Sequence, residues 1–354
     1  MKRNRRYVLF FLSATVVLGS AFFAYEREIR DRFFASAPHG AVYNAATSKT
    51  MGGYRGSPAE VQLSGQLLHS ILIGQSHGQR ISLIARDGTT LWTRGFDRPV
   101  KGLELDGPQL FFATSRSIGS LDLANGETNW KIHLSHAVSG IGTNAGKLIV
   151  LPGFQLSRPY YVDFEASDAF TFTEVPMLGP YAHPRHIVRV EDTWVVADTF
   201  AHTVRVLDAQ SGAQRAYRAA YFPNLIHASQ DGSLVIAEEH GNRILRWWPT
   251  ENKSEIVLAC PNALFSNALA SPEALQEGEG ETWHVGRSVC DARTTPDAIY
   301  SPNGFHLVDG QHLYVADTDN HRVAFFDLSS GERIGTVTGL NSPNRVIALD
   351  QSSN

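Results

Sequence analysis

The chain repeats a pattern of about 40 residues along most of its length, and this periodicity restricts its fold more than any other feature. Each repeat pairs a short apolar run with a polar turn and a second apolar run, and β-branched and aromatic residues dominate both runs. Runs of about four to six such residues between turn formers are typical of strands, not helices. The six clearest hairpins begin at Ile71, Leu110, Leu148, Trp194, Leu234 and Leu313. Antiparallel units of this length, repeated along one chain, predict an all-β β-propeller.

Two kinds of turn residue keep the same period as the hairpins. A glycine follows a polar residue after the second strand of four repeats, where it suits the positive φ of a tight turn into an outer strand. These pairs are Asp87-Gly88, Asn125-Gly126, Ser211-Gly212 and Ser330-Gly331. A proline opens the strand before the hairpin, where its missing N–H costs no ladder hydrogen bond. These prolines are Pro58, Pro99, Pro184, Pro223, Pro261, Pro302 and Pro343. Each repeat is therefore predicted to supply four strands.

Six hairpins predict a six-bladed propeller, with seven blades as the alternative. The last repeat start, Ser342–Asp350, has no hairpin after it. We therefore expect it to pair with the first unit and close the ring, which removes free sheet edges. Pro261 begins a further repeat that lacks a clear hairpin. Residues 263–299 are thus either an insertion from the fifth blade or a degenerate seventh blade.

The first 35 residues form a separate region. Four basic residues (Lys2, Arg3, Arg5 and Arg6) precede an uncharged, mainly apolar run from Tyr7 to Ala24. As a helix, this run of 18 residues would be about 27 Å long and would just cross the hydrocarbon core of a bilayer. Because basic flanks stay in the cytoplasm, the sequence predicts a single-pass signal-anchor in the cytoplasmic (inner) membrane, with the propeller on the periplasmic or other extracytoplasmic side. The predicted regions are a cytoplasmic tip, transmembrane helix and charged juxtamembrane segment at 1–35, a linker at 36–57 and the propeller at 58–350.

A cleaved signal peptide is the alternative for this region. Ala35-Ser36-Ala37 has the A-x-A form of a cleavage site, and Gly19-Ser20-Ala21 is a weaker site inside the apolar run. Either way the body of the protein is exported, to a compartment where disulfides persist. Cys260 and Cys290, the two cysteines of the chain, are therefore predicted to form a disulfide that joins the ends of the 263–299 segment. Two separate thiols are the alternative.

The overall charge and the absence of familiar motifs exclude several classes of function. The chain has 31 basic and 35 acidic residues and a formal net charge of −4, so it lacks the basic field that nucleic-acid binding needs. Its sequence contains no glycine-rich phosphate loop, no Cys/His cluster with metal-ligand spacing and no Gly-x-Ser-x-Gly elbow.

Polar residues recur directly after the opening prolines. Asn224, Asn262, Asn303 and Asn344 share this position, and Arg185 occupies it in another repeat. The innermost strands of a propeller line its central channel, so these side chains are predicted to surround one mouth of that channel. A ring of amides with one guanidinium is a candidate site for a metal, an anion or a hydrogen-bonding ligand. The structural alternative is that each Asn forms an Asx-turn at the entry of its strand.

Histidines and carboxylates also recur within the repeats. His186, His227 and His306 (with His183 beside them) fall on the predicted innermost strands and are candidates for metal or acid–base chemistry. Asp198, Glu238 and Asp317 match one another across three repeats, as do His202, Asn242 and His321. Because an enzyme site is rarely copied into three blades, we expect this second group to fix the central turn of each blade through hydrogen bonds.

Three segments resemble the NHL repeat. They are Ser301–Asp327, His183–Asp208 and Phe222–Trp248, and the first includes Asn320-His321-Arg322-Val323. The first two units look more like PQQ-type propeller repeats, as in Gly119–Leu134. The resemblance covers roughly residues 58–349. It implies an NHL-repeat β-propeller and names no activity, since propellers carry many functions.

Two enzyme families share part of these patterns. The segment from Pro302 to Thr318 is similar to gluconolactonase and strictosidine synthase-like propellers, and this resemblance implies a divalent cation, such as calcium, held by Glu60 with Asn224 and Asn303. Glu60 is not followed by that family's Gly-Pro, and no predicted innermost strand has that family's Asp at the position next to the proline. Ile81–Phe96 resembles the repeat of arylsulfotransferase-like propellers, but their paired histidines are not matched, because His136 stands alone.

The sequence therefore favours a membrane-anchored, non-catalytic propeller that serves as a ligand-binding or protein-interaction scaffold. Its expected partners are the membrane, through the N-terminal helix, and an envelope protein or a small molecule at the channel mouth. A metal-dependent hydrolase or lactonase, or an arylsulfotransferase-like enzyme, is the alternative.

Overall fold

The computed structural model describes residues 43–44, 61–107, 109–153, 158–164, 169–175, 178–179, 181–217, 220, 222–251, 253–259 and 298–349. The chain divides into two compact units, residues 1–42 and 43–354, and all of the described residues belong to the second. The apolar run at 7–24, Glu60, Asn262, both cysteines and the segment 263–299 lie outside the described residues, so the predictions for them stay predictions. No helix in the described part is long and apolar enough to cross a bilayer.

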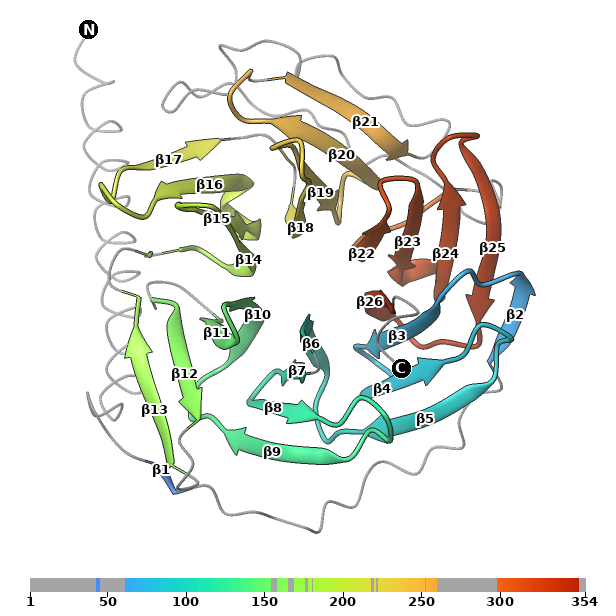
Figure 1. The fold of residues 1–354 in the computed structure, drawn as a ribbon, viewed down its shortest axis with the longest axis horizontal. Coiled ribbons are helices and arrows are strands. Elements are labelled where there is room, and N and C mark those ends of the chain that lie inside the picture. Colours follow the sequence, from blue (N-terminus) through green and yellow to red (C-terminus); the bar gives the residue numbers. More distant parts are fainter. Residues whose placement is uncertain are drawn as a thin grey trace, which may run out of the picture. The chain divides into compact units, whose positions relative to one another are not determined.

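The described residues form an all-β propeller, in which antiparallel four-stranded units surround a common centre (Figure 1). We number the units by their hairpins. The first is β26 (Pro343–Leu349), β3 (Ser70–Gln75), β4 (Arg80–Ile84) and β5 (Thr90–Gly95). The second is β6 (Val100–Asp106), β7 (Gln109–Thr114), β8 (Ser117–Leu121) and β9 (Thr128–His133). The third is β10 (Val138–Asn144), β11 (Lys147–Pro152), β12 (Tyr160–Phe164) and β13 (Ala169–Glu174).

The remaining strands follow the same order. The fourth unit is β14 (Pro184–Val190), β15 (Thr193–Asp198), β16 (Thr203–Asp208) and β17 (Gln214–Tyr217). The fifth is β18 (Pro223–Ala228), β19 (Leu234–Glu238), β20 (Arg243–Trp248) and β21 (Lys253–Ala259). The sixth is β22 (Pro302–Val308), β23 (His312–Asp317), β24 (Arg322–Asp327) and β25 (Glu332–Thr338). Short 3-10 turns, η1 (Thr199–Ala201) and η4 (Thr318–Asn320), follow β15 and β23. All six predicted hairpins are confirmed, and β26, β6, β10, β14, β18 and β22 are the innermost strands (Figure 1).

Both ends of the described chain take part in pairings with distant segments. Strand β26 pairs antiparallel with β3, for example Val346 with Ile73, which confirms that the last repeat start joins the first unit. On the outside, β2 (Gln62–Gly65) pairs antiparallel with β25 and adds a fifth strand to the sixth unit. A two-residue strand, β1 (Tyr43–Asn44), pairs in the same way with β13.

The core lies between neighbouring units, so that each sheet is covered on both faces. Ile71 and Ile73 of the first unit pack with Tyr314 and Phe325 of the sixth, and similar buried clusters fill the spaces between the other neighbours. Burial on both faces explains why the second strands read as continuous apolar runs, since sheets covered on two sides lose the polar–apolar alternation.

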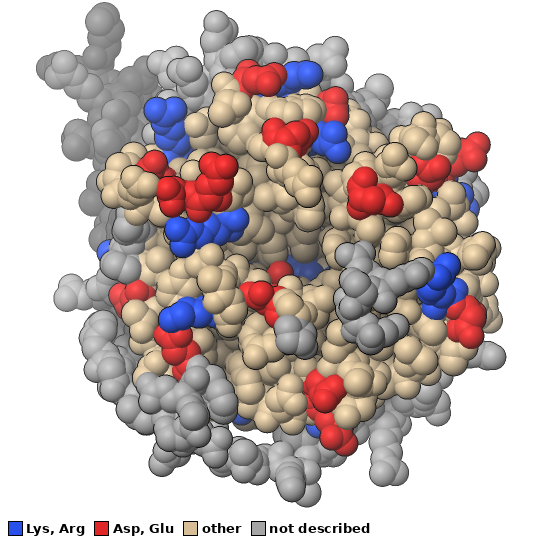
Figure 2. Space-filling view, viewed as in Figure 1, with Lys and Arg blue, Asp and Glu red and all other residues tan. Residues whose placement is uncertain are grey.

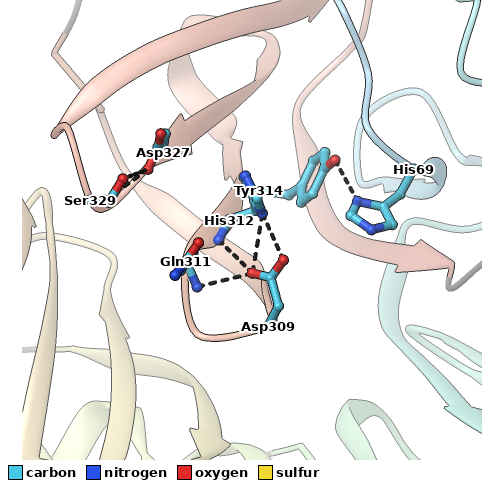
Figure 3. Close-up of polar contacts among 7 residues, drawn as sticks. All are labelled: His69, Asp309, Gln311, His312, Tyr314, Asp327 and Ser329. Carbon is cyan, nitrogen blue, oxygen red and sulfur yellow. Dashed lines mark hydrogen bonds and ion pairs between the residues drawn. The ribbon is translucent and has the colours of Figure 1, made fainter.

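The turns use the residues that the sequence analysis singled out. Gly88, Gly126, Gly212 and Gly331 all have φ between 70° and 88°, as predicted for the turn into the outer strand. Figure 3 shows a second device in the sixth unit. There the Asp309 carboxylate accepts the N–H groups of Gln311 (3.0 Å) and His312 (3.1 Å), and Asp327 accepts that of Ser329 (2.8 Å). Short polar side chains thus satisfy backbone donors that the turns expose.

Two glycines bring the third and fourth units unusually close at the channel. Ile141 of β10 forms a parallel bridge with His186 of β14, and this bridge joins the two units into one nine-stranded sheet. A Cβ on Gly140 would lie 1.9 Å from the Arg185 carbonyl oxygen, and one on Gly142 would lie 2.4 Å from that of Ile187. Only glycine permits this backbone approach.

Candidate functional site

Every innermost strand has a bulge at its second residue, and these six residues lie at the same end of the channel. The register shifts there in all six pairings of a first with a second strand. A bulge leaves one residue unpaired and redirects its side chain. The residues at the bulges are Asn344, Lys101, Ser139, Arg185, Asn224 and Asn303. The structure therefore places the four described residues of the predicted mouth ring at equivalent positions, and it adds Lys101 and Ser139.

The sequence did not reveal Lys101, because Pro99 is displaced by one residue from the position of the equivalent prolines. Pro184 pairs with Asp198, and the equivalent partner of Thr114 is Val100, not Pro99. Pro99 therefore lies one residue before the position of the other opening prolines, and counting from it points to the wrong residue. Aligning the second strands, rather than the prolines, would have found Lys101.

The three asparagines tie neighbouring units together at the mouth. The Asn224 Nδ2 donates to Glu239 Oε2 (2.9 Å) and to the Asn303 Oδ1. The Asn303 Nδ2 donates in turn to Thr318 Oγ1 (2.9 Å), and the Asn344 Nδ2 donates to the Val100 carbonyl (2.7 Å). All three side chains are buried. The Asn224–Asn303 and Asn344–Val100 bonds link neighbouring units, whereas Asn303 also donates to the Ser301 carbonyl at the entry of its own strand (3.4 Å).

Arg345 crosses the mouth and was not predicted. It follows the bulge in β26, where the other innermost strands have Gly, His or Leu, so no repeated pattern marks it. Its side chain is 2% exposed, and Nη1 donates to the carbonyls of Asn303 (2.8 Å) and Asn344 (2.7 Å) and to Asn224 Oδ1 (3.3 Å). Within the described residues, its Nε and Nη2 have no hydrogen-bond partner. A buried guanidinium is thus held in place by one nitrogen while two others stay unsatisfied.

Three cations, Lys101, Arg185 and Arg345, lie near one another at the mouth, within electrostatic reach of carboxylates. Burial lowers the pKa of Arg345 to about 10, and the nearby Arg185 contributes to the same shift. Burial also lowers the pKa of Lys101, again with contributions from Arg185 and Arg345, and the pKa of Arg185. Glu239 raises the pKa of all three cations. Figure 2, which shows one face of the molecule, has basic and acidic atoms together inside the central hollow.

The predicted channel histidines are engaged with other units. The His186 Nδ1 accepts the Ile226 N–H (3.4 Å), so Nε2 carries the hydrogen and donates to Glu104 Oε1 (2.8 Å). The His306 Nδ1 accepts the Ala348 N–H at 2.6 Å. The His227 ring lies 6.5 Å from that of His306, and burial, followed by His186, lowers its pKa.

The repeated carboxylates fix the central turns, as predicted. Asp198 accepts the His183 N–H (2.8 Å) and Arg205 Nε (2.9 Å), and Asp317 accepts the Tyr300 N–H (2.6 Å) and Arg322 Nε (2.7 Å). Glu238 pairs with Arg243 in the fifth unit. The matching residues His202, Asn242 and His321 share a positive φ of 50–54°. They share a left-handed turn conformation, and the side chains of Asn242 and His321 also accept an N–H from the next unit, from Ser301 (2.8 Å) and Ser342 (3.2 Å).

Aromatic and imidazole rings surround part of the mouth. Phe200, in η1, is 51% exposed, and its ring stacks on His183 with 4.4 Å between centroids and 17° between planes. The Phe222 ring lies edge-on to those of His202 (4.2 Å) and His240 (4.3 Å). Burial lowers the pKa of His183 to about 3, and the charges of Arg185 and Lys101 add to the effect, so this rim lies within electrostatic reach of the cations. We call Phe200, His183 and Phe222 the aromatic rim.

The described part of the predicted calcium site does not fit a cation. The amides of Asn224 and Asn303 are bonded to each other, and Arg345 donates to Asn224 Oδ1 and to the Asn303 carbonyl. In the described residues, no three His, Cys, Asp or Glu side chains are grouped so that they could hold a metal. His136, from the arylsulfotransferase comparison, bonds to Tyr160 Oη at 2.9 Å.

Comparisons with known proteins agree with this architecture. The family model of the NHL repeat matches residues 300–326. Among solved structures, a protein of unknown function from Bacteroides caccae has 13% identity and a TM-score of 0.56, over 80% of this chain and 98% of that one. A chain of the nidogen/laminin complex has 15% identity and a TM-score of 0.55, over 80% and 99%. At these identities the likeness shows the fold alone. A search of curated proteins finds no match to the sequence.

Proposed function

We propose that this β-propeller, which carries an NHL repeat, is a binding protein and that its channel mouth holds a small organic anion. The observation that carries the proposal is Arg345, whose buried Nε and Nη2 have no partner among the described residues. Leaving buried charged donors unsatisfied costs free energy. A carboxylate would satisfy both nitrogens at once, since planar guanidinium groups bind carboxylates through two parallel hydrogen bonds.

The neighbouring charges support an anion rather than a cation. Arg185 and Arg345 contribute to the lowered pKa of Lys101, and Arg185 contributes to that of Arg345. Glu239 is an acidic group that acts on all three cations in the opposite direction. An anion would offset their mutual repulsion, whereas a calcium ion would add to it. The amides of Asn224 and Asn303 are neutral and hydrogen-bonded to each other, so they are poor ligands for a calcium ion. This argues against the metal-dependent hydrolase as the function of the mouth.

The proposed propeller has six blades, and residues 263–299 are an insertion between the fifth and sixth. The packing between these two blades supports this count. Leu225 and Val235 of the fifth unit share one buried cluster with Phe305 and Val315 of the sixth. A seventh blade between them would separate these side chains.

The mouth is tested by thermal unfolding of the full-length, detergent-extracted protein with sodium acetate, sodium phosphate or calcium chloride. We expect acetate to raise the Tm, because a ligand that binds only the native state stabilises it, by about 2.7 kcal/mol at 100 times its Kd. Lys101→Met and Arg345→Met should abolish this rise. Lys147→Met is the matched control, since Lys147 pairs with Asp163 in the third unit, and should keep it.

The Arg345 variant should itself fold, because an apolar residue of similar size removes a buried, half-satisfied charge. A Tm that rises with calcium and not with acetate would replace the anion site by a metal site. A rise with acetate that persists in both mouth variants would place the anion elsewhere.

We propose further that the apolar run at 7–24 anchors the propeller outside the cytoplasmic membrane. Its cation asymmetry supports this topology. Intact mass of membrane-extracted protein tests it: an N-terminus before Tyr7 fits an anchor, and a mature N-terminus at or after Phe22 indicates cleavage. The same spectrum without reduction, after thiol alkylation, reports whether Cys260 and Cys290 are joined.

A further inference from the structure

We propose that the anion bound at the channel mouth carries a planar aromatic group, and that this group packs on the aromatic rim formed by Phe200, His183 and Phe222. The inference rests on the anion site proposed above and adds the chemical class of the ligand: a monocarboxylate with an aromatic ring.

Phe200 is an exposed large apolar side chain that does not lie on an outer strand. Two other large apolar side chains in the described residues are similarly exposed, Leu91 (56%) and Ile256 (49%), and these belong to the outer strands β5 and β21. Phe200 instead lies in the turn that follows β15, next to the entry of an innermost strand. An exposed aromatic ring beside buried charged groups is typical of a ligand site, where one surface binds an apolar part and polar groups fix orientation.

The turn around Phe200 is held rigidly. Thr199 Oγ1 donates to the Pro223 carbonyl of the next unit (2.6 Å), and the His202 N–H donates to the Thr199 carbonyl (3.1 Å). The ring is further fixed by stacking on His183 (4.4 Å). A ring that is already ordered loses little conformational entropy when it contacts a ligand, so its contact area contributes efficiently to affinity.

His183 connects the rim to the cations. It lies two residues before Arg185, and burial keeps its imidazole neutral with a pKa of about 3. The buried, neutral imidazole stacks on one face of the half-exposed Phe200 ring and so holds that flat surface in place. A ligand whose carboxylate contacts Arg345 would then have its ring directed outward along this surface, where offset or edge-to-face ring contacts are favourable.

The acidic side of the mouth limits the ligand's charge. Glu239 contacts Asn224, and burial followed by the charge of Glu239 raises the pKa of Asp319 in the neighbouring turn. A second negative charge on the ligand would meet these carboxylates. The cations and the acids together therefore favour a single carboxylate over a phosphate or a dicarboxylate.

The test compares ligands that differ only in their apolar part. Isothermal titration of the full-length protein with acetate, cyclohexylacetate and phenylacetate should give the lowest Kd for phenylacetate. We expect it to be about tenfold below that of acetate, which corresponds to about 1.4 kcal/mol. Phe200→Ala should remove most of this preference, so that the Kd values of acetate and phenylacetate approach each other. Leu91→Ala, an equally exposed apolar residue on an outer strand, is the control and should change neither Kd.

The outcomes separate the two proposals. Equal Kd values for acetate and phenylacetate, or a preference that survives Phe200→Ala, would overturn the aromatic rim and leave the anion site intact. Failure of all three carboxylates to bind would overturn the anion site itself. A cyclohexylacetate Kd equal to that of phenylacetate would show an apolar subsite without selection for a planar ring, and would contradict the ligand class proposed here.

Discussion

The N-terminal and C-terminal halves of the propeller build the same four-stranded unit with different chemistry at its central turn. In the fourth to sixth units, the second strand ends in a buried carboxylate that pairs with an arginine: Asp198 with Arg205, Glu238 with Arg243 and Asp317 with Arg322. In the first to third units the corresponding residues are Gln75, Thr114 and Pro152, none of which carries a charge.

What the halves share is a backbone hydrogen bond. The residue after the second strand donates its N–H to the residue before the innermost strand in both halves, for example Ser115 to Pro99 (3.0 Å) and Thr199 to His183 (3.1 Å). The geometry of the unit is thus set by the main chain, and the buried ion pair is one of several side-chain solutions that it accepts. This explains why the NHL pattern is recognisable only in the C-terminal half although the fold is continuous.

The largest expected difference between the halves comes from breaking one ion pair. Asp317→Asn keeps the shape of the side chain but removes the negative charge that pairs with the mostly buried Arg322. Removing one partner of a buried pair typically costs about 3–5 kcal/mol of unfolding free energy. Urea denaturation followed by tryptophan fluorescence measures this loss. A cost below about 1 kcal/mol would mean that the charged turn behaves like a surface ion pair.

A smaller loss is expected at a neutral turn. The Thr114 Oγ1 accepts the N–H groups of Ser117 (3.0 Å) and Arg116 (3.4 Å). Thr114→Val removes this acceptor without changing the size of the side chain, which should cost about 1–2 kcal/mol. The same denaturation experiment checks it, with Thr114→Ser as a control that retains the hydroxyl. If Thr114→Val costs as much as Asp317→Asn, the two halves do not differ energetically.

The smallest expected effect is on the pH dependence of stability, through the exposed turn carboxyls, and it should be equal in the two halves. Hydrogen bonds lower the pKa of the exposed turn carboxyls Asp87, through the Thr89 backbone N–H first, and Asp327, through the Ser329 hydroxyl first. A lowered carboxyl pKa stabilises the fold above the unfolded value of about 3.9, and that contribution is lost as pH falls through the folded value. Asp87→Asn and Asp327→Asn should each flatten the decline of Tm slightly between pH 5 and pH 2. Unequal slopes would show that the halves also differ at their outer turns.

The parts of the fold that repeat were predictable from the sequence, and the parts that occur once were not. Strand β26 was expected to close the ring because its start keeps the period and no hairpin follows it. The strand expected after Pro58 was assigned wrongly, because β2 pairs with β25 on the outside of the sixth unit. The bridge between β10 and β14 was not foreseen, since Gly140 and Gly142 differ from turn glycines only in what approaches them. A close backbone contact leaves no mark in one sequence.

The same reasoning applies to the candidate site. The position of Asn224, Asn303 and Asn344 was found because it recurs, whereas Arg345 and Phe200 appear once each. The side chains that give the mouth its chemistry are therefore the ones that the repeat does not predict. The residues that recur in the repeat are those that build each blade. A ligand at the mouth would contact several blades at once, so the residues that bind it need not match one another.

The pairing of β26 with β3 also means that the first unit can be completed only after β26 has been synthesised. On a ribosome, about 250 residues are made between the end of β5 and the end of β26, which takes roughly 13–50 s at about 5–20 residues per second. Throughout this interval the first unit lacks its innermost strand, and β3 offers an unpaired edge that other strands could join. Asn344 and Arg345 arrive only with that last strand. A nascent chain that has not yet reached β26 therefore has most of the propeller but lacks two of the side chains that form the channel mouth.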